Sequence, residues 1–216
     1  MNIFVASRAA EGSLVERYGI ALDKIVYVGN GLNQLSAESA VVRSGRPRRV
    51  LFVGREPLRK GLDILLSAMS EVVKIIPDAT LTVVGTGEFA LGSEPEWLDS
   101  RGLVRDRLEL SAIYDDHDIF CLPARQESFG LVAVEALSRG LPCVVSSVGE
   151  LPNTVRDRLE GRVVAAEDVD ALATALIELM ADDREFSLMS ARALARASAF
   201  DWDEIAGRIL RRITNA

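Results

Sequence analysis

The sequence predicts an α/β fold in which one parallel sheet carries helices on both faces. Short apolar runs alternate with segments of helical periodicity along most of the chain, and this alternation is typical of strand–helix–strand crossovers. With 49% hydrophobic and 26% charged residues, the 216-residue chain has the composition of a globular protein that buries a sizeable core.

The expected strands of the sheet are short apolar runs, and they lie near 50–54, 80–85, 119–123, 142–147 and 161–165. The expected helices show apolar residues at helical spacing, and they lie near 61–75, 107–115, 129–139, 169–181, 183–197 and 201–213. The third helix ends at Gly140-Leu141-Pro142, a Gly/Pro stop signal, and Asp201 is a candidate N-cap for the last. Too few residues separate Gly87 from Trp97 for a full helix, so we expect one shortened crossover.

Two segments precede the first strand of this sheet. Residues 1–33 are expected to form a strand at 2–7, a helix at 8–18 and a strand at 24–28. The polar segment 35–49 is rich in arginine and is interpreted as a solvated connection into the strand near 50–54.

Charge and composition argue against several functions. A net charge of −7 and a pI near 4.9 disfavour nucleic acid, whose phosphates need a basic face, and give no indication of membrane association. No apolar stretch approaches the roughly 20 residues of a membrane span, and the first residues are too short for a signal-peptide core, so we expect a cytoplasmic protein. Cys121 and Cys143 are expected to be reduced core thiols, and one histidine without a Cys/His cluster predicts no metal.

The most informative segment joins the strand near 119–123 to the next helix, and it reads Glu127-Ser128-Phe129-Gly130-Leu131-Val132-Ala133-Val134-Glu135. One carboxylate falls at the turn and the other about two turns into the helix. The N–H groups of Phe129, Gly130 and Leu131 are expected to be unpaired, and such a helix N-terminus binds anions, phosphate above all. The carboxylates lie up to about 12 Å apart, whereas glycosidase pairs lie about 5–9.5 Å apart. The pair is therefore suited to holding two ends of one long ligand.

This segment, from Glu127 to Glu135, resembles the Glu–seven residues–Glu motif of retaining glycosyltransferases of the GT-B fold, in the large family 4, the glycosyl transferases group 1. Five other segments resemble elements of that family in the same order: Tyr27-Val28-Gly29-Asn30-Gly31-Leu32-Asn33, Val50-Leu51-Phe52-Val53-Gly54-Arg55 with Lys60-Gly61, Leu81-Thr82-Val83-Val84-Gly85-Thr86-Gly87, Gly140-Leu141-Pro142-Cys143-Val144-Val145 and Gly161-Arg162-Val163-Val164. Each segment alone is weakly specific, but their order and spacing over residues 25–213 are strongly specific.

The resemblance implies a Rossmann-like parallel sheet that forms the C-terminal, donor-binding half of a GT-B fold. Residues 34–216 would be the nucleotide-sugar-binding domain, and residues 1–33 a remnant of the N-terminal acceptor domain with the linker. The implied activity is transfer of a sugar, with retention, from a nucleotide-diphosphate-sugar to an acceptor hydroxyl. The acceptor, a sugar or a lipid-linked glycan, would bind through a missing N-terminal domain, so the isolated half is expected to be inactive. For the full-length enzyme, peripheral association with the inner face of the membrane is an alternative to a purely cytoplasmic location.

The resemblance also implies roles for individual residues. Arg55 and Lys60 would bind the diphosphate, Glu127 the hydroxyls of the donor sugar, and Glu135 the ribose diol; Arg55, Lys60 and Glu127 would be the catalytic residues. The expected donor-binding residues are Gly54, Arg55, Lys60, Gly85, Glu127, Ser128, Phe129, Gly130, Leu131 and Glu135. The two strand-end glycines among them would allow close backbone approach to the ligand. We expect no metal and no cofactor, because the cations and the helix N-terminus replace them.

Some features depart from the family pattern or leave alternatives open. The family commonly has a Gly-Gly pair followed by Pro-Glu after the strand near 142–147, where this chain has Gly149-Glu150-Leu151-Pro152-Asn153, so that turn is expected to differ. His117 is interpreted as a surface or capping residue without a general-base role. Two alternatives remain: a non-catalytic nucleotide-sugar-binding subunit or remnant that needs a separate acceptor domain, and an unrelated flavodoxin-like binding domain.

Overall fold

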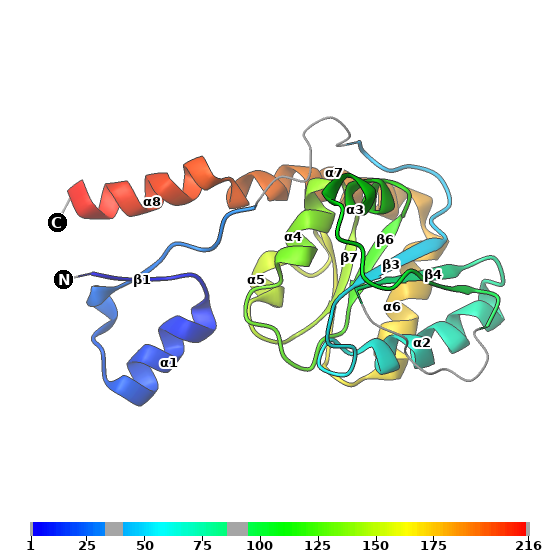
Figure 1. The fold of residues 1–216 in the computed structure, drawn as a ribbon, viewed down its shortest axis with the longest axis horizontal. Helices are drawn as coiled ribbons and strands as arrows, with labels where there is room; N and C mark the ends of the chain where they lie inside the picture. Colours follow the sequence, from blue (N-terminus) through cyan, green and yellow to red (C-terminus); the bar gives the residue numbers. More distant parts are fainter. Residues whose placement is uncertain (1, 33–40, 86–94, 215–216) are drawn as a thin grey trace.

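A computed structural model describes residues 2–32, 41–85 and 95–214 (Figure 1). The strands are β1 Ile3–Val5, β2 Ile25–Tyr27, β3 Arg49–Val53, β4 Thr80–Val84, β5 Leu98–Ser100, β6 Ile119–Leu122, β7 Cys143–Ser146 and β8 Gly161–Val164. The helices are α1 Arg8–Tyr18, α2 Leu62–Ile75, α3 Arg107–Asp115, α4 Leu131–Ser138, α5 Leu151–Thr154, α6 Val169–Ala181, α7 Asp183–Ala197 and α8 Trp202–Thr214, with short 3-10 helices η1 Leu22–Lys24 and η2 Ser198–Phe200.

The main sheet contains six parallel strands in the order β5-β4-β3-β6-β7-β8. Counted from β3 as the first strand, this is the order 3-2-1-4-5-6 of doubly wound sheets. The strand order reverses between β3 and β6, where Val50 is in register with Ile119. In sheets of this kind, ligands bind in the crevice outside the carboxyl ends of the strands at the reversal.

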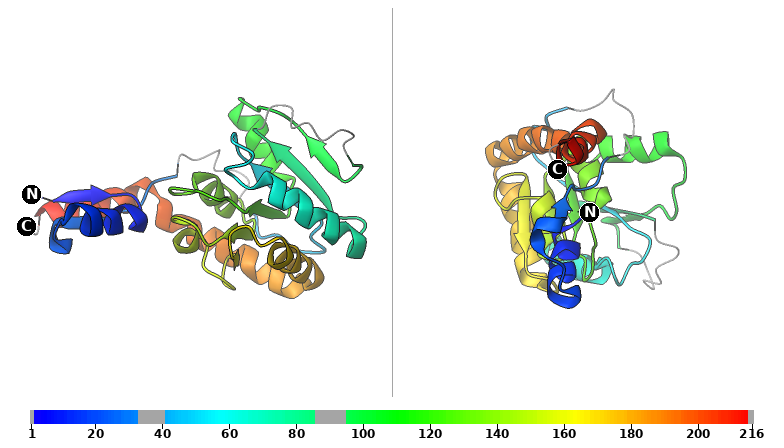
Figure 2. Two further views of the ribbon diagram at one scale, coloured as in Figure 1. Left: turned by 90° about the horizontal axis from the view of Figure 1, so that it is seen from below. Right: turned by 90° about the vertical axis from the view of Figure 1, so that its left-hand side faces the viewer.

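Helices cover both faces of this sheet, which explains why its central strands β3, β6 and β7 are largely apolar. Every residue of β6 and β7 is buried. On one face α2 packs against α6; on the other α4 packs against α7, with α3 beside α4 (Figures 1 and 2). The predicted fold class, a parallel sheet with helices on both faces, is confirmed.

Residues 2–28 form a separate small unit. Its two strands, β1 and β2, pair in parallel, and α1 lies beside them with all its residues at least partly exposed. The last helix, α8, leaves the main sheet and runs along this unit (Figures 1 and 2). Arg212 Nη2 donates to the Asp23 carbonyl at 2.6 Å, and Arg208 Nη1 to the Val28 carbonyl at 2.9 Å. The chain therefore connects the two units twice.

Most expected elements agree closely with the structure, and the helices expected at 8–18, 107–115, 169–181 and 183–197 coincide with α1, α3, α6 and α7. Two elements were not expected. The edge strand β5 has the polar sequence Leu-Asp-Ser and pairs with β4 through its backbone, and α5 spans only four residues, with Pro152 in its first turn. The expected boundary between residues 33 and 34 lies outside the described residues.

The expectation of a solvated connection over 35–49 holds only in part for residues 41–49, because Pro47 is buried and Arg43 and Arg48 are partly buried, whereas the other six residues are exposed. The side chain of Arg43 is only 14% exposed, and it donates to carbonyl groups at the ends of α3 and α4. The backbone N–H groups of Arg48 and Arg49 both donate to Asp118 Oδ2 at 2.9 Å. The segment is fixed to the main domain because its arginines meet acceptors that sequence patterns do not reveal; residues 35–40 lie outside the described part.

The cysteines behave as expected for reduced core thiols. Cys121 on β6 and Cys143 on β7 are free and buried, and burial raises the pKa of both thiols. A buried, protonated thiol is inert, so neither is a candidate nucleophile. Within the ranges that the structure describes, no helix is long and apolar enough to cross a membrane.

Candidate functional site

A cleft of about 390 Å³ opens at the carboxyl ends of β3 and β4, beside the reversal of strand order. Five of the expected donor-binding residues line it: Gly54, Arg55, Lys60, Gly85 and Glu135. The apolar side chains of Leu103, Val104, Leu110 and Val132 contribute to its lining as well. The cleft thus combines cations on the loop after β3, a carboxylate on α4, and apolar side chains.

Glu127 is joined to this cleft through an ion pair with Lys60. Lys60 Nζ donates to Glu127 Oε2, and the two side chains are 13% and 10% exposed. The other oxygen, Oε1, accepts from the N–H groups of Ser128 at 2.9 Å and Phe129 at 3.4 Å. Burial raises the pKa of Glu127, but Lys60 and the two N–H groups outweigh burial and hold the pKa below its ordinary value. The carboxylate is therefore ionised at neutral pH and covers the N–H groups just before α4.

This geometry corrects one expectation about the turn before α4. The N–H of Phe129 is directed at Glu127 and is not unpaired, because the carboxylate folds back over the turn. The Phe129 ring is buried against Phe200, with ring centroids 6.0 Å apart. Gly130, at φ 86°, occupies the N-cap position, so Ser128 is not the cap. The loop after β7 packs directly on this turn, since a Cβ added at Gly149 would lie 1.6 Å from the Glu127 carbonyl oxygen.

Glu135 lies on α4 at the edge of the cleft, and its carboxylate has a partner that the sequence did not predict. The hydroxyl of Tyr114, on α3, donates to Glu135 Oε2 at 3.0 Å. Burial raises the pKa of Glu135, and the Tyr114 hydrogen bond and the charge of Arg107 offset only part of that rise. The site thus holds two carboxylates with opposite shifts, because Glu127 pairs with a cation and Glu135 with a neutral hydroxyl.

The remaining residues of the cleft differ in their exposure and in their contacts with neighbouring residues. Arg55 is exposed on the cleft wall. Its neighbours Glu56 and Arg59, which also line the cleft, form an ion pair of 2.7 Å with each other. Gly85 has φ 94°, and a Cβ added there would lie 2.9 Å from the Gly54 carbonyl oxygen, so only glycine fits this junction of strand ends. Thr86 and Gly87, which follow it, lie outside the described residues.

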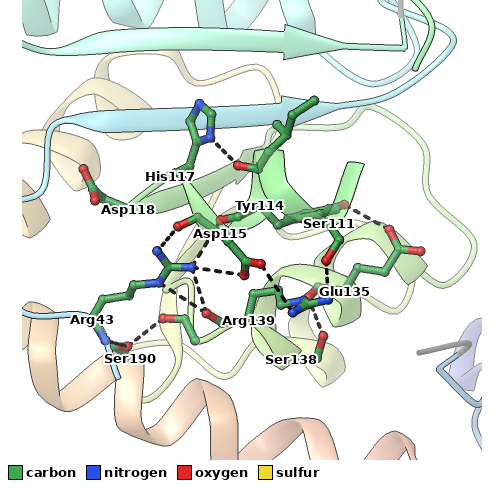
Figure 3. A network of polar contacts seen from close by, with 12 residues as sticks. Arg43, Ser111, Tyr114, Asp115, His117, Asp118, Glu135, Ser138, Arg139 and Ser190 are labelled. Carbon is green, nitrogen blue, oxygen red and sulfur yellow. Dashed lines mark hydrogen bonds and ion pairs between the residues drawn. The ribbon is translucent and has the colours of Figure 1, made fainter. Parts of the chain in front are cut away.

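Figure 3 shows a polar network behind Glu135 that the sequence did not reveal. Arg43 Nη2 donates to the carbonyls of Tyr114 and Arg139, both at 3.2 Å. Arg43 and Arg139 approach Asp115 from two sides, with closest N–O distances of 3.8 and 3.5 Å. Arg139 also donates to Ser111 Oγ at 2.5 Å. The network ties segment 41–49 to the C-terminal ends of α3 and α4.

His117 is buried, so the interpretation of a surface residue is wrong, whereas a capping contact is present. Its Nδ1 lies 2.5 Å from the carbonyl of Ile113 in the last turns of α3. Burial lowers the pKa of His117, and the hydrogen bond to Ile113 opposes that effect. The ring stabilises the end of α3 and does not face the cleft lining.

No group of three or more His, Cys, Asp or Glu side chains in the described part of the chain is placed to hold a metal ion. Asp168 and Asp170 have the spacing of a metal motif, but they lie at the start of α6. Asp168 caps that helix by accepting from the Ala171 N–H at 2.8 Å.

Sequence relatives place the chain in a family. The family described as glycosyl transferases group 1 matches residues 47–182. The chain is 33% identical over 220 residues to the phosphatidyl-myo-inositol mannosyltransferase of Mycolicibacterium smegmatis, covering 96% of this chain and 56% of that protein. It is 34% identical over 235 residues to the D-inositol 3-phosphate glycosyltransferase of Xylanimonas cellulosilytica, covering 97% and 56%. The chain therefore belongs to the glycosyl transferases group 1 family, as the resemblance predicted, and spans a little over half the length of these relatives.

Solved structures confirm that the fold is half of a GT-B architecture. Sucrose-phosphate synthase from Thermosynechococcus elongatus matches with a TM-score of 0.79 at 26% identity, over 98% of this chain and 58% of that one. Anabaena Alr3699/HepE, solved in complex with UDP, matches with a TM-score of 0.83 at 20% identity, over 100% of this chain and 64% of that one. The second likeness concerns the fold alone.

Proposed function

We propose that the chain is the donor-binding half of a retaining glycosyltransferase, which moves a sugar from a nucleotide-diphosphate-sugar to an acceptor hydroxyl. The observation that carries the proposal is the cleft beside the strand-order reversal, where Arg55 and Lys60 face the same space as Glu135. A diphosphate requires cations and a ribose requires a hydroxyl acceptor, and this cleft offers both. The names of the relatives specify inositol phosphate and phosphatidylinositol, and they support an acceptor that carries several hydroxyl groups and is either free or attached to a lipid.

The contacts of Lys60 and Glu127 indicate how the donor would bind. Lys60 is paired with Glu127, and Glu127 also covers the N–H groups of Ser128 and Phe129. An arriving diphosphate competes for the same cation and N–H donors. Once displaced from them, the Glu127 carboxylate is available to accept hydroxyls of the donor sugar.

Catalysis in this proposal is electrostatic. The bond between the sugar and the diphosphate breaks as the bond to the acceptor oxygen forms, and negative charge develops on the departing diphosphate. In this proposal that charge would be stabilised by Arg55 and Lys60, which line the cleft, and by the N-terminus of α4, whose first turn contributes Val132 to the lining. The chemistry assigned to these groups needs no metal and no cofactor.

Substitution of the two carboxylates tests the proposal. Glu135→Gln is expected to weaken binding of free UDP, GDP or ADP, because ribose is present in each. Glu127→Gln is expected not to weaken binding of the nucleoside diphosphate, which no longer competes with a carboxylate for Lys60, and to weaken the intact nucleotide-sugar. Each loss is expected to be about 1.5–3 kcal/mol, or about 10- to 150-fold in Kd, by isothermal titration calorimetry.

Two further variants complete this test. Arg55→Ala should weaken both kinds of ligand, since both carry the diphosphate. Glu71→Gln, which removes an exposed carboxylate of α2 outside the cleft lining, should weaken neither. Equal losses of diphosphate affinity at Glu127 and Glu135 would contradict the division of roles between sugar and ribose.

We also propose that the 216-residue chain alone transfers sugar extremely slowly. Residues 2–28 form two three-residue strands, helix α1 and the short 3-10 helix η1, too little to build an acceptor site beside the cleft. The measurement is release of nucleoside diphosphate from UDP-glucose, UDP-N-acetylglucosamine and GDP-mannose in the presence of phosphatidylinositol vesicles. Steady turnover at the rates of ordinary enzymes, about 1 per second or more, would disprove this.

A further inference from the structure

We propose that Tyr114 is a positioning residue for nucleotide binding, whose hydroxyl holds the Glu135 carboxylate in the orientation that accepts the ribose diol. The inference rests on the proposed role of Glu135 and extends it to a residue of a different helix. Of the two hydrogen-bonded residues, Glu135 lines the cleft, whereas Tyr114 lies behind the carboxylate and is not part of the lining.

The geometry of the contact supports a fixed donor. The Tyr114 side chain is completely buried, and its ring packs against Phe120 of β6 with centroids 6.2 Å apart. Its hydroxyl lies 3.0 Å from Glu135 Oε2 and 3.3 Å from the carbonyl of Val132, one turn earlier on α4. Both neighbours are acceptors, so the hydroxyl proton has to point toward α4.

The protonation states of the pair favour one direction of donation. Burial and the nearby Glu135 charge raise the pKa of Tyr114 well above its ordinary value, so the phenol keeps its proton. Burial raises the pKa of Glu135, and the hydrogen bond from Tyr114 acts against that rise. Tyr114 thereby favours the ionised carboxylate. An ionised carboxylate has about four acceptor positions, so one contact with Tyr114 leaves room for two ribose hydroxyls.

Tyr114 is itself fixed by contacts of α3 with its neighbours, as a positioning residue requires. Arg43 Nη2 donates to the Tyr114 carbonyl at 3.2 Å, and Arg139 donates to Ser111 Oγ at 2.5 Å (Figure 3). These contacts fix the last turns of α3 to segment 41–49 and to the end of α4. The Tyr114 hydroxyl therefore has little freedom to follow a displaced Glu135.

The test is to compare nucleotides with and without the ribose hydroxyls. UDP, GDP and ADP, each with its 2′,3′-dideoxy counterpart, are titrated calorimetrically into the wild-type chain and into Tyr114→Phe, which removes only the hydroxyl. The variant is expected to lose about 5- to 10-fold in affinity for the ribose nucleotides, the effect of one hydrogen bond, and less than about 2-fold for the dideoxy nucleotides. Tyr18→Phe, at an exposed site on α1, should change neither affinity.

A second variant keeps the test independent of how well Tyr114→Phe folds. Glu135→Asp retains the charge but shortens the side chain, so the carboxylate can no longer meet both Tyr114 and the ribose. It is expected to reduce the preference for ribose over dideoxyribose as Tyr114→Phe does. In a Glu135→Gln background, Tyr114→Phe should add less than about 2-fold to the loss.

The outcomes separate two kinds of failure. An equal loss for ribose and dideoxy nucleotides in Tyr114→Phe would overturn the positioning role and assign Tyr114 to stability alone. Absence of any ribose preference in the wild-type chain, or a preference unchanged by Glu135→Gln, would instead overturn the proposed role of Glu135. In that case the inference about Tyr114 falls with it.

Discussion

Lys60 and Glu127 form a largely buried ion pair beside the cleft. Both side chains are largely withdrawn from water, and Glu127 also accepts from two backbone N–H groups. Removing one partner from such a pair leaves the other charge partly buried and unpaired, which costs more than loss of a surface salt bridge. The same carboxylate therefore contributes to stability and to the proposed recognition of the sugar.

The contribution of the Lys60–Glu127 ion pair to the free energy of unfolding should depend on pH. The folded pKa of Glu127 is lowered relative to its ordinary value of 4.5, so its contribution is complete above that value and is lost as pH falls through the folded pKa. At pH 7, Glu127→Gln is expected to lower the free energy of unfolding by about 1–3 kcal/mol. The difference from wild type should shrink below pH 4.5, as measured by urea unfolding at several pH values.

The exposed pair of Glu56 and Arg59 supplies the control for this experiment. Its carboxylate is 62% exposed, so Glu56→Gln should change stability at pH 7 much less than Glu127→Gln does. A Glu127→Gln effect that is equally large at pH 7 and at pH 3 would show that charge is not its cause.

Single residues of the site were predictable to different degrees. Glu127 and Glu135 stand out in the sequence because two acids bracket the start of a helix that follows a buried strand. Tyr114 does not stand out, because an apolar-faced helix with one aromatic residue is the ordinary pattern of a core helix. Its link to Glu135 depends on how α3 and α4 are packed, which periodicity within one helix does not specify.

At the level of elements, strand and helix prediction succeeded where side chains determine the element. The buried strands β3, β4, β6 and β7 carry apolar runs, and α6 and α7 carry acidic N-caps, Asp168 and Asp182. β5 was missed because an edge strand can form through backbone hydrogen bonds alone, and α5 because four residues give no measurable period. The contacts that anchor segment 41–49 were not predicted because Arg43 binds backbone carbonyls, which every residue has.

Arg43 gives this element-level contact a testable consequence. Its guanidinium donates to carbonyls of Tyr114, Asp115 and Arg139, so Arg43→Ala leaves three acceptors without their charged donor. We expect the free energy of unfolding to fall by about 2–4 kcal/mol, measured by chemical denaturation. Arg43→Lys should recover only part of this loss, because an ammonium group lacks the planar fork.

Arg46 provides a matched control three residues further along the same segment. It is exposed, so Arg46→Ala is expected to stay within about 0.5 kcal/mol of wild type. Similar losses for both variants would mean that net charge, and not the contacts of Arg43, stabilises the chain.

For the whole molecule, the order of strands and helices along the chain was enough to predict a doubly wound sheet and a ligand site at its carboxyl edge. It was not enough to predict the path of α8. That helix has polar and apolar residues at helical spacing, as any surface helix of the main domain would. Its contacts with the small unit involve backbone carbonyls of Asp23 and Val28, which no sequence pattern distinguishes.

The double connection between the two units restricts how they can move. The outgoing and returning segments are bonded to each other, since the Leu32 N–H donates to the Phe200 carbonyl at 2.7 Å and Gly31 sits directly against the Trp202 indole. A lone tether would let the small unit spin about the chain axis. Two segments that run side by side and are bonded to each other resist rotation about the chain axis more than one segment would. A third contact joins the small unit to the loop after β7, since the Arg8 N–H donates to Glu150 Oε2 at 2.6 Å. Any rotation of the small unit about the paired segments has to break this bond.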